Sequence, residues 1–243
     1  MAVVSVNNLS KDYANLRAVD NISFTIEEGE IFGLIGPNGA GKTTTLRIMA
    51  TILTPTSGDI KIFGYDLKSE GQKIREIVSY LPEEAGAYKN LTGLDYLNFM
   101  ASLYANNKSE KDKFVENAID IAKLEDRIKD KISTYSKGMV RKLLLSRSLM
   151  YKPKLAILDE PTSGLDVINS IEIRKIIKSF TQNGTTVLLS SHNMLEVEFL
   201  SDRIALINKG KILVEGKPDD LKKEYNARNI EEVFIGAIQW ESF

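Results

Sequence analysis

The sequence predicts an α/β protein with a mainly parallel sheet, an N-terminal antiparallel β subdomain and an inserted α-helical subdomain. Three observations predict this fold class. A glycine-rich loop at 36–41 joins a strand-like run to a helix-like run, helical periodicity fills 92–150, and strand and helix patterns alternate again beyond residue 155. The 243 residues, 43% of them hydrophobic, suffice for one large core. We therefore expect a single domain over 1–243, with a helical tail at about 217–243.

The antiparallel parts are predicted from strand-like runs that lie close together in the sequence. Such runs occur at 2–6, 19–26 and 59–63, and turns rich in Asn, Gly, Pro and Ser follow them. A later pair, at 203–207 and 211–215, flanks a short Asn-Lys-Gly turn and predicts a hairpin.

The helical subdomain is predicted at about 90–150. Leu94, Leu97, Ala101 and Tyr104 recur at intervals of three and four, which is the spacing of one helix face. Two helix starts carry a capping pattern, in which Ser or Thr precedes an acidic residue by three positions. These are Thr92 with Asp95, and Ser109 with Asp112.

The glycine-rich loop carries the most specific motif of the chain. The run Gly36-Pro37-Asn38-Gly39-Ala40-Gly41-Lys42-Thr43 fits the pattern G-x-x-x-x-G-K-[ST], with an apolar run before it and a helix-like run from Thr44 onward. Glycines let the backbone turn its N–H groups toward phosphate oxygens at a helix N-terminus. Lys42 would reach the β- and γ-phosphates, and the Thr43 hydroxyl is the natural Mg²⁺ ligand. The motif predicts binding of a nucleoside triphosphate.

Two adjacent carboxylates follow a second buried strand. The apolar run at 155–158 ends in Asp159 and Glu160, and Pro161 begins a turn directly after them. Asp159 can hold Mg²⁺ and Glu160 can polarise a water molecule. An isolated Asp-Glu pair is usually a solvated strand end, but Tyr135-Ser136-Lys137-Gly138-Met139 upstream and Ser163-Gly164-Leu165-Asp166 downstream favour the functional interpretation.

Together these motifs resemble the nucleotide-binding subunit of an ATP-binding-cassette (ABC) transporter along almost the whole chain. The Walker A motif corresponds to 36–43, Walker B to 155–160, the signature loop to 135–139 and the D-loop to 163–166. The resemblance implies a P-loop NTPase core that hydrolyses ATP with Mg²⁺. It also matches the only histidine of the chain, His192, to the family's switch histidine.

The resemblance implies a role for each matched residue. Glu160 would be the general base, with His192 and Lys42 as further catalytic residues, and Thr43, Asp159 and Glu83 would bind Mg²⁺. Tyr13 would stack on adenine, although an ordinary strand tyrosine also fits its position. Ser136 and Gly138 would contact the ATP held by a partner chain, so two copies would form a head-to-tail homodimer. Separate transmembrane permease subunits would carry the transported molecule.

Three residues depart from the family pattern. Glu83 stands where a glutamine is usual and adds a negative charge beside Asp159 and Glu160. Lys137 replaces a glycine and would either approach the partner's phosphate or point to solvent, and Met139 replaces a glutamine. The sequence around these positions most resembles ATPases of drug-efflux-type exporters, although it does not exclude import.

Composition and charge exclude several other classes. The net charge of −1 gives no sign of a nucleic-acid partner, and the absence of cysteine excludes disulfides and thiolate metal sites. No signal-like segment or long apolar run occurs, so we expect a cytoplasmic protein held at the inner face of the membrane by its permease partners. A chromosome-type ABC ATPase would have a long heptad coiled coil between Walker A and the signature loop, and no sustained heptads lie between Lys42 and Ser136 in this sequence. A translation-type ABC ATPase would carry two cassettes in one chain, whereas this sequence carries one. A nucleotide-binding scaffold without ATP hydrolysis would lack catalytic residues, and these are present here.

Overall fold

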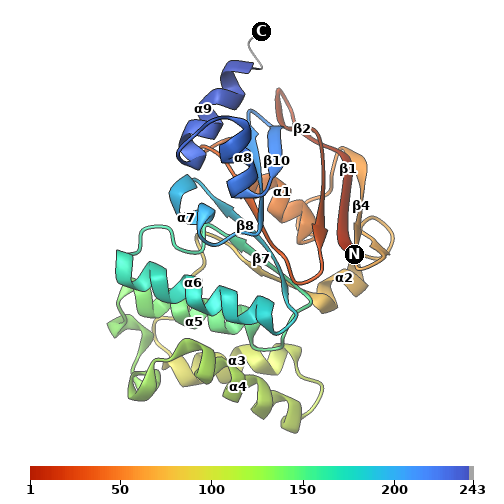
Figure 1. Ribbon diagram of the computed structural model, residues 1–243. Coiled ribbons are helices and arrows are strands. Elements are labelled where there is room, and N and C mark those ends of the chain that lie inside the picture. The colour runs from red at the N-terminus through yellow and green to blue at the C-terminus, as the bar shows by residue number, and fades with distance from the viewer. Residues whose placement is uncertain (241–243) are drawn as a thin grey trace.

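The computed structural model describes residues 1–240, which form two β-sheets and the helices that pack on them, with the antiparallel sheet at one side of the molecule (Figure 1). The first sheet is antiparallel throughout, with the strand order β2-β1-β4-β5. Its strands are β1 (Ala2–Tyr13), β2 (Leu16–Glu27), β4 (Ser57–Ile62) and β5 (Tyr65–Asp66). The first two strands extend well beyond the predicted runs, because bulges let their pairing continue past irregular positions.

The second sheet has the order β10-β9-β3-β8-β7-β6 and is parallel except for the terminal hairpin. The strands β3 (Ile31–Ile35), β7 (Leu155–Asp159) and β8 (Thr186–Ser191) lie in its centre, and every residue in them is buried. Continuous burial is typical of parallel strands that are covered on both faces. Because β3, β8 and β7 run parallel, their carboxyl ends meet at one edge of the sheet. The predicted site residues follow these strand ends.

The outer strands of this sheet are β6 (Val78–Leu81) on one side and the hairpin of β9 (Arg203–Asn208) and β10 (Lys211–Gly216) on the other. The hairpin confirms the pair predicted at the end of the sheet. Its turn is tied to the rest of the fold, because the Gly210 amide donates to the Ala40 carbonyl at 3.0 Å.

Helices α3 (Gly93–Tyr104), α4 (Lys108–Ala122) and α5 (Lys137–Leu149) are inserted between β6 and β7. They gather at one end of the molecule, below the sheets in Figure 1, together with α6 (Val167–Gln182). Short 3-10 helices at Glu125–Lys129 and Ile132–Thr134 join α4 to α5. The inserted helices, the N-terminal antiparallel sheet and the mainly parallel core confirm the predicted fold class.

The remaining helices lie beside the core sheet. They are α1 (Lys42–Met49), α2 (Gly71–Ile77), α7 (Met194–Glu198), α8 (Pro218–Glu224) and α9 (Ile230–Trp240). The last two lie at the end of the molecule opposite α3 and α4 in Figure 1. They occupy most of the predicted C-terminal tail, whose final residues, 241–243, fall outside the described part. Within residues 1–240, no helix is both long enough and apolar enough to cross a membrane.

One of the two predicted helix caps is correct and the other is wrong. Thr92 caps α3 by accepting a hydrogen bond from the Asp95 amide at 3.0 Å. Helix α4, however, begins at Lys108 rather than after Ser109, and its cap is Asn107, which accepts from the Glu110 amide at 3.0 Å. Asn caps a helix about as well as Ser, and the earlier start lets the Glu110 carboxylate accept from the Asn106 amide at 2.7 Å.

Candidate functional site

The glycine-rich loop runs from the end of β3 to the start of α1. Gly41 has a φ of 106° and occupies the N-cap position of α1, where it offers no side chain to the first helical amides. A Cβ on Gly36 would lie 2.0 Å from the Ile207 carbonyl oxygen, so only glycine fits there. The loop therefore leads into a helix N-terminus whose free amides favour an anion.

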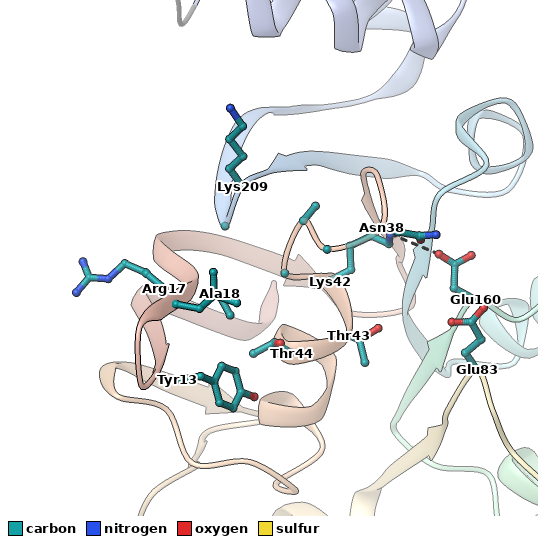
Figure 2. A pocket seen from close by; sticks show the side chains of 15 residues that line it. Tyr13, Arg17, Ala18, Asn38, Lys42, Thr43, Thr44, Glu83, Glu160 and Lys209 are labelled. Atoms are coloured by element: carbon teal, nitrogen blue, oxygen red, sulfur yellow. Dashed lines mark ion pairs between the residues drawn. The ribbon is translucent and has the colours of Figure 1, made fainter.

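Lys42 is buried at the mouth of this loop. Its ammonium group donates to the carbonyl oxygens of Gly36 at 2.7 Å and Pro37 at 3.2 Å. The same nitrogen lies 3.5 Å from Oε1 of Glu160, and Figure 2 shows this ion pair as a dashed line. Since both side chains are about 95% buried (6% and 5% exposed), the pair is shielded from solvent.

Asp159 is buried at the end of β7 and accepts three side-chain hydrogen bonds. Its Oδ1 accepts from the hydroxyls of Ser190 at 2.6 Å and Thr43 at 3.2 Å, and its Oδ2 accepts from the Tyr80 hydroxyl at 3.3 Å. Burial, and then the charge of Asp159, raise the pKa of Tyr80, which therefore stays a donor. Sequence reasoning missed Ser190 and Tyr80, although each stands near the carboxyl end of a strand beside β7.

Glu160 follows Asp159 directly, with a φ of 48° in the left-handed region. Its amide donates to the Ser190 hydroxyl at 3.1 Å, and its Oε2 lies 2.9 Å from Nδ1 of His192. Its Oε1 is buried and has no hydrogen-bond donor among the described residues, apart from the Lys42 ion pair. The strained backbone thus holds a carboxylate between Lys42 and the half-exposed His192.

Glu83 follows β6 and faces the same region from a different loop. Its Oε1 accepts a hydrogen bond from the Ser163 hydroxyl at 3.0 Å. In Figure 2 its carboxylate lies near that of Glu160, on the side of the cavity opposite Tyr13. Glu83 therefore bonds to the D-loop here, and the predicted contact with a metal stays a prediction.

A cavity of about 420 Å³ connects these groups with Tyr13 at the end of β1. Tyr13 is 41% exposed, and the Lys11 ammonium lies 5.1 Å from the centre of its ring. The ring lies below Thr44 in Figure 2, and Arg17 and Lys209 extend away from the loop. The cavity is lined by Tyr13, Leu16, Arg17, Ala18, Asn38, Gly39, Ala40, Gly41, Lys42, Thr43, Thr44, Glu83, Glu160, Lys209 and Gly210.

Ser136 and Gly138 are not among the residues lining this cavity. Ser136 caps α5 by accepting from the Met139 amide at 3.3 Å, and a Cβ on Gly138 would lie 2.3 Å from Oδ1 of Asn169. Lys137 turns back onto its own chain, where its ammonium occupies the space that a Cβ on Gly164 would need. Lys137 is exposed, which agrees with the predicted orientation toward solvent, and the approach to a partner's phosphate stays a prediction.

The oxygen donors near the loop suit Mg²⁺, which takes few protein ligands and shares the rest with water and substrate phosphates. The hydroxyl of Thr43 and the carboxylate of Asp159 lie 3.2 Å apart, and within residues 1–240 Oε1 of the adjacent Glu160 has the Lys42 ion pair but no hydrogen-bond donor. Within residues 1–240, no three His, Cys, Asp or Glu side chains cluster tightly enough to bind a metal by themselves. The donor set therefore fits a cation only together with a nucleotide.

Comparisons with known proteins agree with this geometry. The family model described as "ABC transporter" matches residues 19–163. The linearmycin resistance ATP-binding protein LnrL of Bacillus subtilis is 36% identical over 97% of this chain and 76% of its own length. The bacitracin transport ATP-binding protein BcrA of Bacillus licheniformis is 35% identical over 91% of this chain and 72% of its own length.

Two solved structures have a similar fold. The structure of an ATP-binding subunit of an ABC transporter is 26% identical, with a TM-score of 0.85 over 97% of this chain and 99% of the other. The dimeric post-hydrolysis structure of the ATP-binding cassette MJ0796, bound to ADP and Pi, is 25% identical, with a TM-score of 0.79 over 88% of this chain and 98% of the other. With the phosphate-binding loop and the buried carboxylates in place, the chain belongs to the ABC transporter family and is an ATP-binding ATPase.

Proposed function

We propose that this chain is the nucleotide-binding subunit of an ABC exporter and powers transport through separate membrane-spanning subunits. The observation that carries the proposal is the placement of Glu160. Its carboxylate is buried between Lys42 at 3.5 Å and His192 at 2.9 Å, and one of its oxygens has no hydrogen-bond donor in the described part of the chain. A carboxylate oxygen held in this way can accept a proton from an attacking water molecule.

Each remaining group has a role in hydrolysis. Lys42 binds the β- and γ-phosphates of ATP, and the helix N-terminus at Gly41 adds its amides. His192 orients the γ-phosphate or the attacking water. Thr43 and Asp159, with Glu83 as a further oxygen donor, would hold Mg²⁺, which spreads the charge that develops on the phosphate oxygens.

The nucleotide site of one chain is completed by a second chain in this proposal. Ser136 is exposed and lies outside the lining of the cavity that contains Lys42, as does Gly138, and in this proposal both serve the ATP of a partner. The dimeric state of the related cassette MJ0796 supports a homodimer. Two copies packed head to tail would close two ATP molecules between Walker A and the opposing signature loop, and hydrolysis would reopen them.

Export through a permease is supported by two findings. The names of LnrL and BcrA refer to linearmycin resistance and bacitracin transport. In this chain, α3 and the loop before it expose large apolar side chains, with Tyr88 at 58%, Phe99 at 45% and Leu103 at 63%. The surface formed by these three residues suits a short apolar helix of a membrane subunit. The chain would then lie on the cytoplasmic face of the membrane.

We further propose that residues 1–243 act as a single ABC ATPase domain. The helical subdomain at about 90–150 would move with the permease, and Tyr13 would stack on adenine at the rim of the cavity. The helical segment at about 217–243 would close the domain on the side opposite the helical subdomain. Nothing in the charge balance of the chain favours nucleic acid as a partner.

The test is phosphate release by three purified proteins, namely the unmodified chain, Glu160→Gln and His192→Ala. Loss of the general base should lower turnover by about 100-fold or more, while ATP affinity, measured by calorimetry, should remain. A Glu160→Gln protein that hydrolyses ATP at the original rate would refute the assigned chemistry. Co-expression with any membrane protein that proves to be encoded beside this chain tests the permease, which should co-purify with the cassette and change its rate of hydrolysis.

A further inference from the structure

Arg141 is a buried arginine whose hydrogen bonds, within the described residues, all go to the main chain. It is only 7% exposed, and its guanidinium donates to backbone carbonyls on two separate loops. The bonds are to the carbonyl oxygens of Pro82 (3.3 Å), Glu83 (3.1 Å), Asp159 (3.1 Å), Glu160 (2.6 Å) and Pro161 (2.7 Å).

The two loops are the segments that follow β6 and β7. The first loop carries Glu83, and the second carries Glu160 directly after Asp159, the last residue of β7. The strands themselves are hydrogen-bonded neighbours only up to the pair Leu81 and Leu158, so beyond that point the ladder no longer holds the loops together. One planar guanidinium bridges them by donating to carbonyls on both sides, in addition to the bond from the Ser163 hydroxyl to Glu83.

The positive charge of Arg141 also interacts with the acidic side chains of the site. Burial lowers its pKa, and the charges of Glu83, Asp159 and Glu160 oppose that shift. An arginine stays protonated under such conditions, so it supplies a fixed cation behind these carboxylates. Lys42 supplies the other cation, on the side of the phosphate-binding loop.

We propose that Arg141 is a positioning residue for ATP hydrolysis, which holds the loops bearing Glu83, Asp159 and Glu160 at the spacing that the reaction needs. It acts through the main chain and touches no reacting atom. The inference rests on the proposed role of Glu160 as the base. Because Arg141 lies on the helix that begins just after Ser136, it also links the signature loop mechanically to the carboxylates.

The test is Arg141→Lys, which keeps the charge but cannot span five carbonyls with one ammonium group. The matched control is Arg147→Lys on the same helix, whose guanidinium makes only longer contacts, at 3.5 Å to Tyr96 and 3.4 Å to Ser148. ATP-binding sites are counted by calorimetry, and turnover is expressed per binding site.

We expect Arg141→Lys to lower turnover per site by about tenfold or more, because small displacements of reacting groups are costly. ATP affinity should stay within about threefold, as for loss of an interaction made only in the transition state. Arg147→Lys should stay within about twofold in both quantities. A merely structural role would instead reduce the number of binding sites and leave turnover per site unchanged, and that result would overturn the proposal. Glu160→Gln, assayed in parallel, distinguishes this failure from failure of the proposed base.

If Arg141→Lys does not fold, hydrogen exchange of the unmodified protein decides the question. Peptides covering 82–84 and 159–162 should open together with those of α5 as denaturant is added, because one side chain joins all three segments. Opening of either loop at much lower denaturant than α5 would overturn the proposal.

Discussion

Replacing Ser190 with alanine tests the hydrogen-bond network around Asp159. The Ser190 hydroxyl is fully buried, donates to Oδ1 of Asp159 at 2.6 Å and accepts from the Glu160 amide at 3.1 Å. Its removal deletes a hydrogen bond to a carboxylate. The Glu160 amide keeps a partner, since it also donates to the Ser190 backbone carbonyl at 3.2 Å.

The magnitude follows from these contacts. A hydrogen bond to a charged group contributes about 1.5–3 kcal/mol, and no buried donor is orphaned, so the free energy of unfolding should fall by about 2 kcal/mol. For a chain of this length, that corresponds to a drop in Tm of about 4–8 °C. The Asp159 carboxylate would keep only the longer bonds from Thr43 and Tyr80.

The assay is urea unfolding followed by far-UV circular dichroism. Ser146→Ala is the matched control, because that hydroxyl is equally buried but donates only to the Leu143 carbonyl one helical turn away. It should cost about 1 kcal/mol or less. Equal losses for the two variants would refute the reasoning, since the effect of Ser190 would then be no more than that of any buried serine.

Three further predictions concern the nucleotide site. Lys42→Ala should abolish ATP binding, because no other cation can replace its contacts with the phosphates, and calorimetry with undiminished affinity would disprove this. Glu83→Gln should keep the fold and lower the Mg²⁺ concentration for half-maximal turnover, because one repulsive carboxylate is lost. An unchanged or higher Mg²⁺ requirement would remove Glu83 from the metal site. Tyr13→Ala should weaken ATP binding by about 1 kcal/mol, as lost aromatic stacking does, whereas Tyr13→Phe should bind normally, and equal affinities for all three proteins would return Tyr13 to a structural role.

Contiguous motifs made much of the site predictable from the sequence. The residues from Gly36 to Thr43 form one loop and the start of α1, and their motif predicts both the turn and the helix that follows. Asp159 and Glu160 end a strand whose continuous apolar character predicts burial on both faces. In each case the chemistry and the local structure are encoded by the same few neighbouring residues.

Other parts depend on contacts between distant segments. Ser190 and Tyr80 reach Asp159 only because their strands flank β7, and the sequence alone does not state that order. Arg141 looks like an ordinary basic residue of an amphipathic helix until its bonds to two loops are seen. The start of α4 was mispredicted because Asn107 and Ser109 are comparable caps, and local propensity does not separate them.

In the proposed mechanism, ATP closes two copies of this chain on each other. The most direct measurement is the mass of Glu160→Gln by light scattering during gel filtration, since this variant should bind ATP without hydrolysing it. We expect a monomer without nucleotide or with ADP, a dimer with ATP, and loss of that dimer when Ser136→Arg is added, because a bulky cation would block the partner's γ-phosphate. A Glu160→Gln protein that binds ATP and stays monomeric at every accessible concentration would contradict it.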